Sequence, residues 1–209
     1  PPRSTLFPYT TLFRSPIGMA SFAAAAATPA PDPTVTQCDR LASHPEDPDH
    51  VAPGVSSSKV DLPKAVAVCG AEIKKQPDNL RIRYQYARVL AYSGQSKLAT
   101  EQMQIAADGG YRQAQFVYGL FIDRNRADAP TDICLVEQNW LKSARAGRQA
   151  ARVIYVHHVL NGRFDACRIQ ASPADLKQLL DDATANASEF YERLLIGDLK
   201  AQLAARSAS

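Results

Sequence analysis

The chain of 209 residues contains 45% apolar and 22% charged residues, and its formal net charge is +3. These values allow one domain with a sizeable core, and so mild a charge argues against a nucleic-acid partner. No run of about 18 apolar residues is present that could span a membrane. The sequence has no glycine-rich phosphate loop, nucleophile elbow or HExxH motif, so we predict neither an enzyme nor a cofactor.

The first part of the chain carries a segment that we exclude from the fold prediction. Residues 5–15, TLFPYTTLFRS, look like the in-frame translation of a common short-read sequencing adapter. We interpret them as a scar of metagenomic sequence assembly. The alternative interpretation is a genuine apolar leader.

The next segment has the features of a secretory signal. Residues 16–27 are apolar, and residues 28–36 are rich in Thr, Pro and Asp. This order is typical of the end of a signal peptide, with peptidase cleavage after Ala25, Ala27 or Ala30. The alternative is a low-complexity Ala-Pro linker.

The folded domain is predicted to span residues 37–206, and residues 1–36 are predicted to be disordered. The domain begins with an arm, residues 37–62, that is rich in Pro, Asp, Ser and His. This composition predicts extended chain with turns rather than a helix. A protein with such a leader would be periplasmic or secreted.

Eight helices are predicted after the arm, because the apolar residues recur with the 3.6-residue period and no segment has the alternation of a strand. They are expected over residues 63–75, 80–92, 97–108, 111–123, 131–145 and 148–161, from an N-cap at Ser172 through Ala183, and over 189–204. Asp78 is expected to cap the second helix. Phe190, Leu194 and Leu203 are expected to face inward from the last one.

A repeated unit organises the central helices. The segment Ala106–Ile122 ends one helix, breaks at a Gly-Gly pair and starts a second helix. Moving on by 37 positions aligns Gly110 with Gly147 and Tyr118 with Tyr155. Units that recur at this length are helical hairpins, which must stack on their neighbours to bury their apolar faces.

The pattern of a helix, a small-Gly turn, Ala-Gln and then Tyr-Gly-Leu resembles the bacterial Sel1-like repeat, a relative of the tetratricopeptide repeat. The resemblance covers residues 78–162. It implies an all-α, right-handed superhelix of stacked antiparallel hairpins, preceded here by an irregular arm. The chain departs from the family pattern at residues 123–130, which replace a glycine-rich loop, and at His157, which stands where the preceding copy has Leu120.

Four cysteines, Cys38, Cys69, Cys134 and Cys167, allow three disulfide pairings. If the helices on either side of Gly147 pack antiparallel, Cys134 lies opposite Leu160, and Cys167 follows in the loop that leaves that helix. This geometry favours the pairs Cys134–Cys167 and Cys38–Cys69. The alternative is four reduced core cysteines in a cytosolic protein.

A metal site is not predicted. His157 and His158 invite a zinc hypothesis together with Cys134 and Cys167. Adjacent residues point to different sides of a helix, so at most one histidine could share a site with both thiolates. Lining a groove or packing between repeats is the predicted role of the histidines.

The resemblance implies that the first helix of each hairpin lines a concave binding face. These helices contain arginines and tyrosines but neither Asp nor Glu, whereas the acids of the repeats lie in second helices and loops. The predicted partner-binding residues are Arg83, Arg88, Arg112, Tyr118, Arg152 and Tyr155. A basic face of this kind attracts acidic ligands. In the alternative, several of these arginines turn to the outer surface.

We expect from these observations a monomeric, periplasmic or secreted scaffold that binds an acidic protein or peptide through its concave face, as Sel1-like repeat proteins are generally thought to do. The alternative is a cell-wall or carbohydrate-associated accessory factor that binds a small ligand in the groove. A catalytic domain would need a cleft with perturbed titratable groups.

Overall fold

The computed structural model describes residues 34–207 except 127 and 169–170, and this part of the chain is all-α. The predicted adapter scar, signal peptide and cleavage positions lie outside the described residues. The described elements are α1 (Gln37–Ala42), the short 3-10 helix η1 (Ser57–Lys59), α2 (Leu62–Lys75), α3 (Leu80–Tyr92), α4 (Ser96–Asp108), α5 (Arg112–Asp123), α6 (Ile133–Arg145), α7 (Gln149–Leu160), α8 (Pro173–Asn186) and α9 (Phe190–Ser207). None of these helices is long and apolar enough to cross a membrane.

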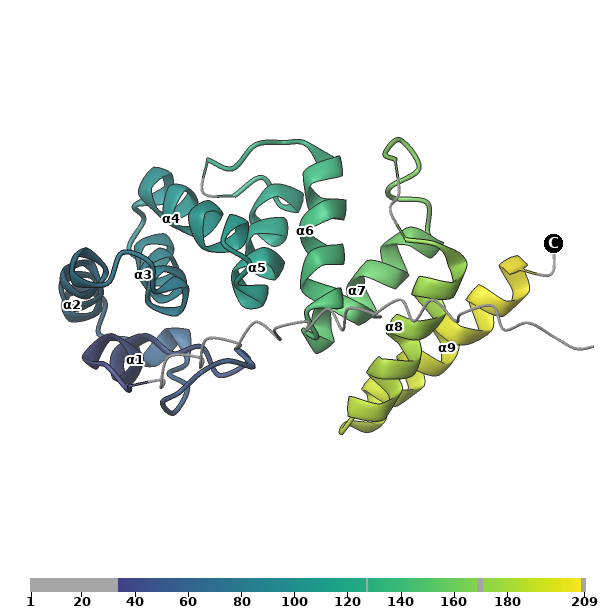
Figure 1. The fold of residues 1–209 in the computed structure, drawn as a ribbon, viewed down its shortest axis with the longest axis horizontal. Helices are drawn as coiled ribbons and strands as arrows, with labels where there is room; N and C mark the ends of the chain where they lie inside the picture. Colours follow the sequence, from purple (N-terminus) through teal and green to yellow (C-terminus); the bar gives the residue numbers. More distant parts are fainter. Residues whose placement is uncertain (1–33, 127, 169–170, 208–209) are drawn as a thin grey trace, which may run out of the picture. The chain divides into compact units, whose positions relative to one another are not determined.

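Each helix from α2 onward packs against the next one in the chain, as Figure 1 shows. Two pairs of helices that are not consecutive also pack together: α1 with α3, and α7 with α9. The eight predicted helices are present with ends within two or three residues of the predicted ones.

The arm contains a helix that the prediction missed. Residues 37–42 form α1, because the Thr36 hydroxyl accepts from the Asp39 amide and the Asp39 carboxylate accepts from the Thr36 amide. This reciprocal capping satisfies backbone donors at a helix start. The prediction of a purely extended arm was therefore wrong over these six residues.

Two other local predictions need correction. The N-cap of α3 is Asn79, whose side chain accepts from the Ile82 amide, and not Asp78. In α9 the buried residues are Ile196, Leu199 and Leu203, whereas Phe190 and Leu194 are 71% and 61% exposed. In the first case two adjacent residues could both act as the N-cap, and in the second several apolar residues could form the buried face. The helical period alone does not decide between such neighbours.

The glycine turns are built alike. Gly94, Gly110, Gly147 and Gly162 all have positive φ, between 72° and 94°. At Gly110 the amide donates to the Ala107 carbonyl, and the next amide, of Tyr111, donates to the Ala106 carbonyl. This closure needs a left-handed residue after the helix, which glycine adopts without steric cost.

The large core is formed by residues from α3 through α9 and includes Trp140. The Trp140 ring is fully buried, and its indole nitrogen donates to the Phe116 carbonyl at 3.1 Å. Gly119 leaves room for this ring, because a Cβ there would lie 2.4 Å from the indole nitrogen. The His158 ring stacks on Trp140 at 5.2 Å between centroids. The equivalent tyrosines Tyr118 and Tyr155 are both buried in this core.

A second, smaller core holds the arm against α2 and α3. It contains the Cys38–Cys69 disulfide, Ile82 and Val89. The other disulfide joins Cys134, at the start of α6, to Cys167 in the loop after α7. Both predicted pairings are therefore present in the structure, and no free cysteine remains in the described residues, which include all four.

The two disulfides should differ in their sensitivity to reductant. Cys38 and Cys69 are fully buried, whereas Cys134 and Cys167 are partly exposed. A reductant reaches an exposed sulfur without local unfolding, so we expect Cys134 and Cys167 to open first. Stepwise reduction with alkylation and peptide mass spectrometry measures this order. Labelling of the native chain without reductant, or first labelling at Cys38 and Cys69, would contradict the structure.

Candidate functional site

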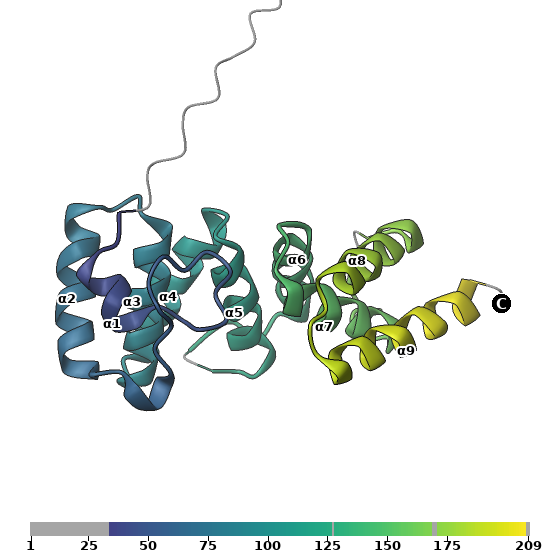
Figure 2. The same cartoon turned by 90° about the horizontal axis from the view of Figure 1, so that it is seen from below.

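The chain's own arm covers part of the predicted basic face, at Arg88 of α3 and Arg112 of α5. Figures 1 and 2 show α1 and the loop that follows it lying against the same side of α3 and α5. The acids of the arm meet the basic and polar side chains of the first helices there.

Arg88 of α3 is the centre of this contact and is only 4% exposed. Its guanidinium donates to the carbonyls of Ala42, Ser43 and Val55 at 2.8, 3.1 and 2.6 Å, and it lies over the Tyr92 ring. Three backbone carbonyls, two at the end of α1 and one from residue 55 further along the arm, therefore accept hydrogen bonds from one buried guanidinium. The fork of donors in arginine suits such an arrangement.

Asp39 provides the second contact. Its carboxylate is fully buried and receives two hydrogen bonds from Arg81, at 2.8 and 3.1 Å, and one from Gln85 at 2.8 Å. Burial raises the pKa of Asp39, but the hydrogen bonds from Arg81, the Thr36 amide and Gln85 outweigh it, so the pKa lies below its usual 3.8. Asp39 is thus held as a carboxylate.

Asp47 and Asp49 bind the start of α5. Tyr111 donates its hydroxyl to the buried Asp47 at 2.7 Å, and Arg112 forms a two-pronged ion pair with Asp49 at 2.7 and 2.6 Å. Burial raises the pKa of Asp47 despite the hydrogen bond from Tyr111. In the same loop, burial and then the charge of Arg88 lower the pKa of His44 to about 4, so that imidazole stays neutral at neutral pH.

The other predicted binding arginines are also engaged within the chain. Arg83 donates to Gln102 of α4 at 2.6 Å, and Arg152 forms an ion pair with Asp182 of α8 at 3.1 Å. Arg148, which is not one of the predicted binding residues, is 8% exposed, donates to Gln113 and lies over the Phe116 ring. Each of these arginines therefore has a partner within the chain.

The two predicted binding tyrosines lie in the core. Tyr118 is 4% exposed, and Tyr155 is fully buried with its hydroxyl donating to Glu137 at 2.9 Å. Neither ring offers a surface to a partner in this conformation. The structure thus brings the arginines of the predicted site to the arm and to neighbouring helices, and places its tyrosines inside the core.

The histidine pair is split between solvent and core, as the helix geometry requires. His157 is exposed, and His158 packs on Trp140. In the described part of the chain no group of three or more His, Cys, Asp or Glu residues lies close enough to hold a metal ion.

An open apolar surface lies on α9 and α7. We call it the α7–α9 groove, an open depression of about 530 Å³ lined by Ala150, Val153, Ile154, His157, Tyr191, Glu192 and Leu195. Tyr191 is 79% exposed and Leu195 43% exposed. Aromatic and large aliphatic side chains at an accessible groove are typical anchors of protein recognition.

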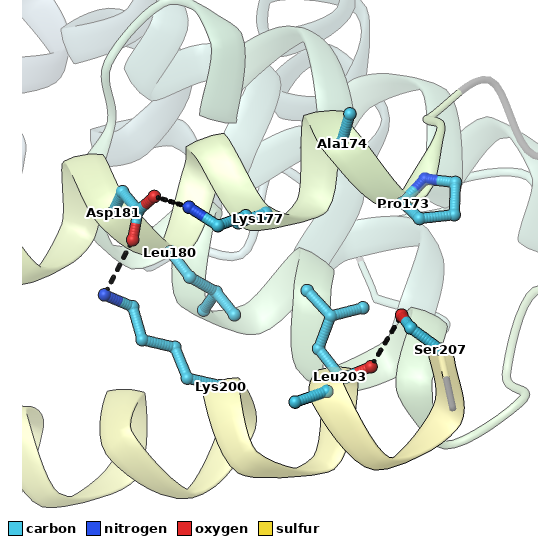
Figure 3. Close-up of a pocket in the computed structure, with 9 residues that line it drawn as sticks. Pro173, Ala174, Lys177, Leu180, Asp181, Lys200, Leu203 and Ser207 are labelled. Carbon is cyan, nitrogen blue, oxygen red and sulfur yellow. Dashed lines mark hydrogen bonds and ion pairs between the residues drawn. The ribbon is translucent and has the colours of Figure 1, made fainter. Parts of the chain in front are cut away.

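A second cavity lies between α8 and α9, and Figure 3 shows its lining. It encloses about 380 Å³, with Leu180 and Leu203 on its apolar side. Lys177 and Lys200 both pair with Asp181, at 2.7 and 2.8 Å, so each charged side chain at this cavity already has a partner within the chain. No aromatic ring is among the lining residues, so the cavity lacks the stacking platform that sugar sites commonly use.

The sequence analysis did not identify the α7–α9 groove. The segment Phe190–Leu195 carries four large apolar residues that point to several sides of the helix, so one buried face cannot accommodate all of them. This excess of apolar residues was the signal in the sequence that part of α9 would be an exposed apolar surface. The groove also needs α7, which lies 30 residues earlier in the sequence and is brought to α9 only by the fold.

Comparison with protein-family models, curated proteins and solved structures gives no significant match.

Arg88 should contribute far more to stability than Arg112. Arg88→Ala leaves three arm carbonyls without their buried donor, so we expect the free energy of unfolding to fall by about 3–5 kcal/mol. Arg112 and Asp49 are partly exposed, so Arg112→Ala should cost about 1 kcal/mol or less. Urea unfolding with intact disulfides measures both. Equal losses would show that the Arg88 contacts are not special.

The stability of the fold should fall at acid pH because of Asp39. Its pKa is lower in the folded than in the unfolded chain, so its contribution is present above pH 3.8 and is lost as the pH falls through the lower, folded value. Asp47, whose pKa is raised, acts in the opposite direction. Asp39→Asn should lower stability at neutral pH and flatten the acid limb of a urea-unfolding series.

The matched control for Asp39 is Asp181→Asn. Lys177 and then Lys200 lower the pKa of Asp181 to about 2, but this carboxylate is on the surface and water screens its ion pairs. An acid limb that depends on Asp181 and not on Asp39 would refute the assignment.

Proposed function

We propose that the chain is a helical-repeat scaffold of the Sel1-like or TPR-like kind that binds a segment of another protein in the α7–α9 groove. The observation that carries this proposal is the exposed pair Tyr191 and Leu195 beside the apolar side chains of α7. Two anchors at i and i+4 on one helix, facing a second helix, form a groove of the kind that receives an apolar peptide or helix.

The scaffold proposal is supported by the repeated turn geometry at Gly110 and Gly147 and by the equivalent burial of Tyr118 and Tyr155. Stacked hairpins of this kind form a superhelix with extended surfaces for partners. The partner differs from the acidic one that the arginines suggested, because Asp39, Asp47 and Asp49 of the arm already engage that face.

We also propose a periplasmic or extracellular location. Two disulfides join all four cysteines, and such bonds persist in oxidising compartments. The small-ligand alternative would use the cavity between α8 and α9, whose charged residues are paired with each other.

Peptide selection on the full chain tests the binding proposal. From a random displayed library we expect enrichment of peptides with two large apolar residues at helical spacing. Leu195→Asp should raise the dissociation constant of these peptides at least about tenfold, because it places a charge in the apolar groove. Ile105→Asp is the matched control, since Ile105 is similarly exposed, at 47%, but lies on α4. Selection of acidic peptides whose binding is indifferent to Leu195→Asp would overturn the proposal.

A further inference from the structure

The outer face of α9 carries an apolar stripe that is separate from the α7–α9 groove. Phe190, Leu194, Gly197 and Ala201 recur at helical spacing, and all four are exposed. Tyr191 and Leu195, which line the groove, lie about 100° further round the helix because each follows a stripe residue by one position. One helix therefore presents two apolar surfaces, which face different directions and adjoin at its first turn, where the Phe190 and Tyr191 rings meet edge to face at 5.4 Å between centroids.

Within the described part of the chain, no contact or backbone conformation requires a glycine at position 197. It lies in the middle of an 18-residue helix, its φ is not positive, and a Cβ added there would meet nothing within 4 Å. Glycine in a helix interior costs about 1 kcal/mol relative to alanine. A glycine that no contact in the chain requires, flanked by exposed apolar residues, leaves space for the close approach of another backbone.

The order of side-chain sizes along the stripe suggests what approaches. The large residues, Phe190 and Leu194, lie in the first half, and the small ones, Gly197 and Ala201, lie in the second half. Both pairs are four residues apart. An antiparallel copy of the same helix therefore places Leu194 over Gly197 of the second copy and Phe190 over Ala201 of the second copy.

We propose that α9 mediates a homodimer in which the α9 helices of two copies pack antiparallel through this stripe. Twofold symmetry repeats each large-on-small contact, which gives four such contacts in one self-complementary interface. Small residues at the crossing permit close helix packing. On one edge of the stripe, the Tyr191 hydroxyl can reach Asp198 of the second copy, and the interface thus has a polar rim.

The size of the surface limits the strength of the dimer. An 18-residue helix is about 27 Å long, and a contact formed mainly by one helix pair lies at the small end of specific interfaces. A reversible dimer in the micromolar range follows, which replaces the monomer expected from the sequence.

Sedimentation equilibrium of the full chain over a wide concentration range tests the dimer. Leu194→Asp should raise the dimer dissociation constant at least about tenfold, because it buries a charge opposite Gly197. Ile105→Asp should leave it unchanged, and circular dichroism should show that both variants remain folded. Leu195→Asp should weaken peptide binding in the groove and leave dimerisation intact, so the two proposals can fail separately.

A crosslinking experiment tests the register. All four native cysteines are paired, so Gly197→Cys introduces a single free thiol. In the proposed register the two Gly197 Cα atoms approach within disulfide range, about 4.4–6.8 Å. Mild oxidation should therefore link two chains through position 197 much faster than through Ile105→Cys. A wild-type chain that stays monomeric throughout, or equal crosslinking at both positions, would overturn the proposal.

Discussion

The structure depends on the buried charge of Arg88. A guanidinium with 4% exposure is stable only if its donors are matched. The carbonyls of α3 are used along the helix, so α3 itself offers only the Tyr92 hydroxyl, which accepts from Arg88 Nε at 3.2 Å. The carbonyls of Ala42, Ser43 and Val55 supply the match. These residues lie on both limbs of the arm, so one side chain fixes the path of a segment that has little regular structure of its own.

The remaining contacts of the arm follow from this anchor. Once the arm lies along α3, its carboxylates reach Arg81, Tyr111 and Arg112. The Cys38–Cys69 disulfide joins residues 31 positions apart and holds the arm near its binding surface. A crosslink of this kind stabilises by about 2–4 kcal/mol, chiefly by restricting the unfolded chain. Partly exposed ion pairs such as Arg112–Asp49 can then form with little further loss of entropy.

Much of the fold was predictable because its signals are local. The helical period located eight helices, the glycines marked their ends, and an antiparallel hairpin about Gly147 was sufficient to pair Cys134 with Cys167. The site was not predictable in the same way. Complementary charge shows that arginines need acids, but it does not distinguish acids of a partner from acids in the same chain. The path of the arm, which decides this, has no period to detect.

Helix α9 carries more large apolar residues than its one buried face can hold. Ile196, Leu199 and Leu203 complete the core against α7 and α8, and this uses one side of the helix. The other large residues then remain outside, at 71% exposure for Phe190 and 79% for Tyr191. Leaving such rings in water forgoes roughly 25 cal/mol for each Å² that burial would remove. The arm covers the polar face of the first helices, but no described segment covers this face of α9. The surfaces of α3 and α9 therefore differ: the arm covers part of α3, whereas the described chain leaves large apolar residues of α9 exposed.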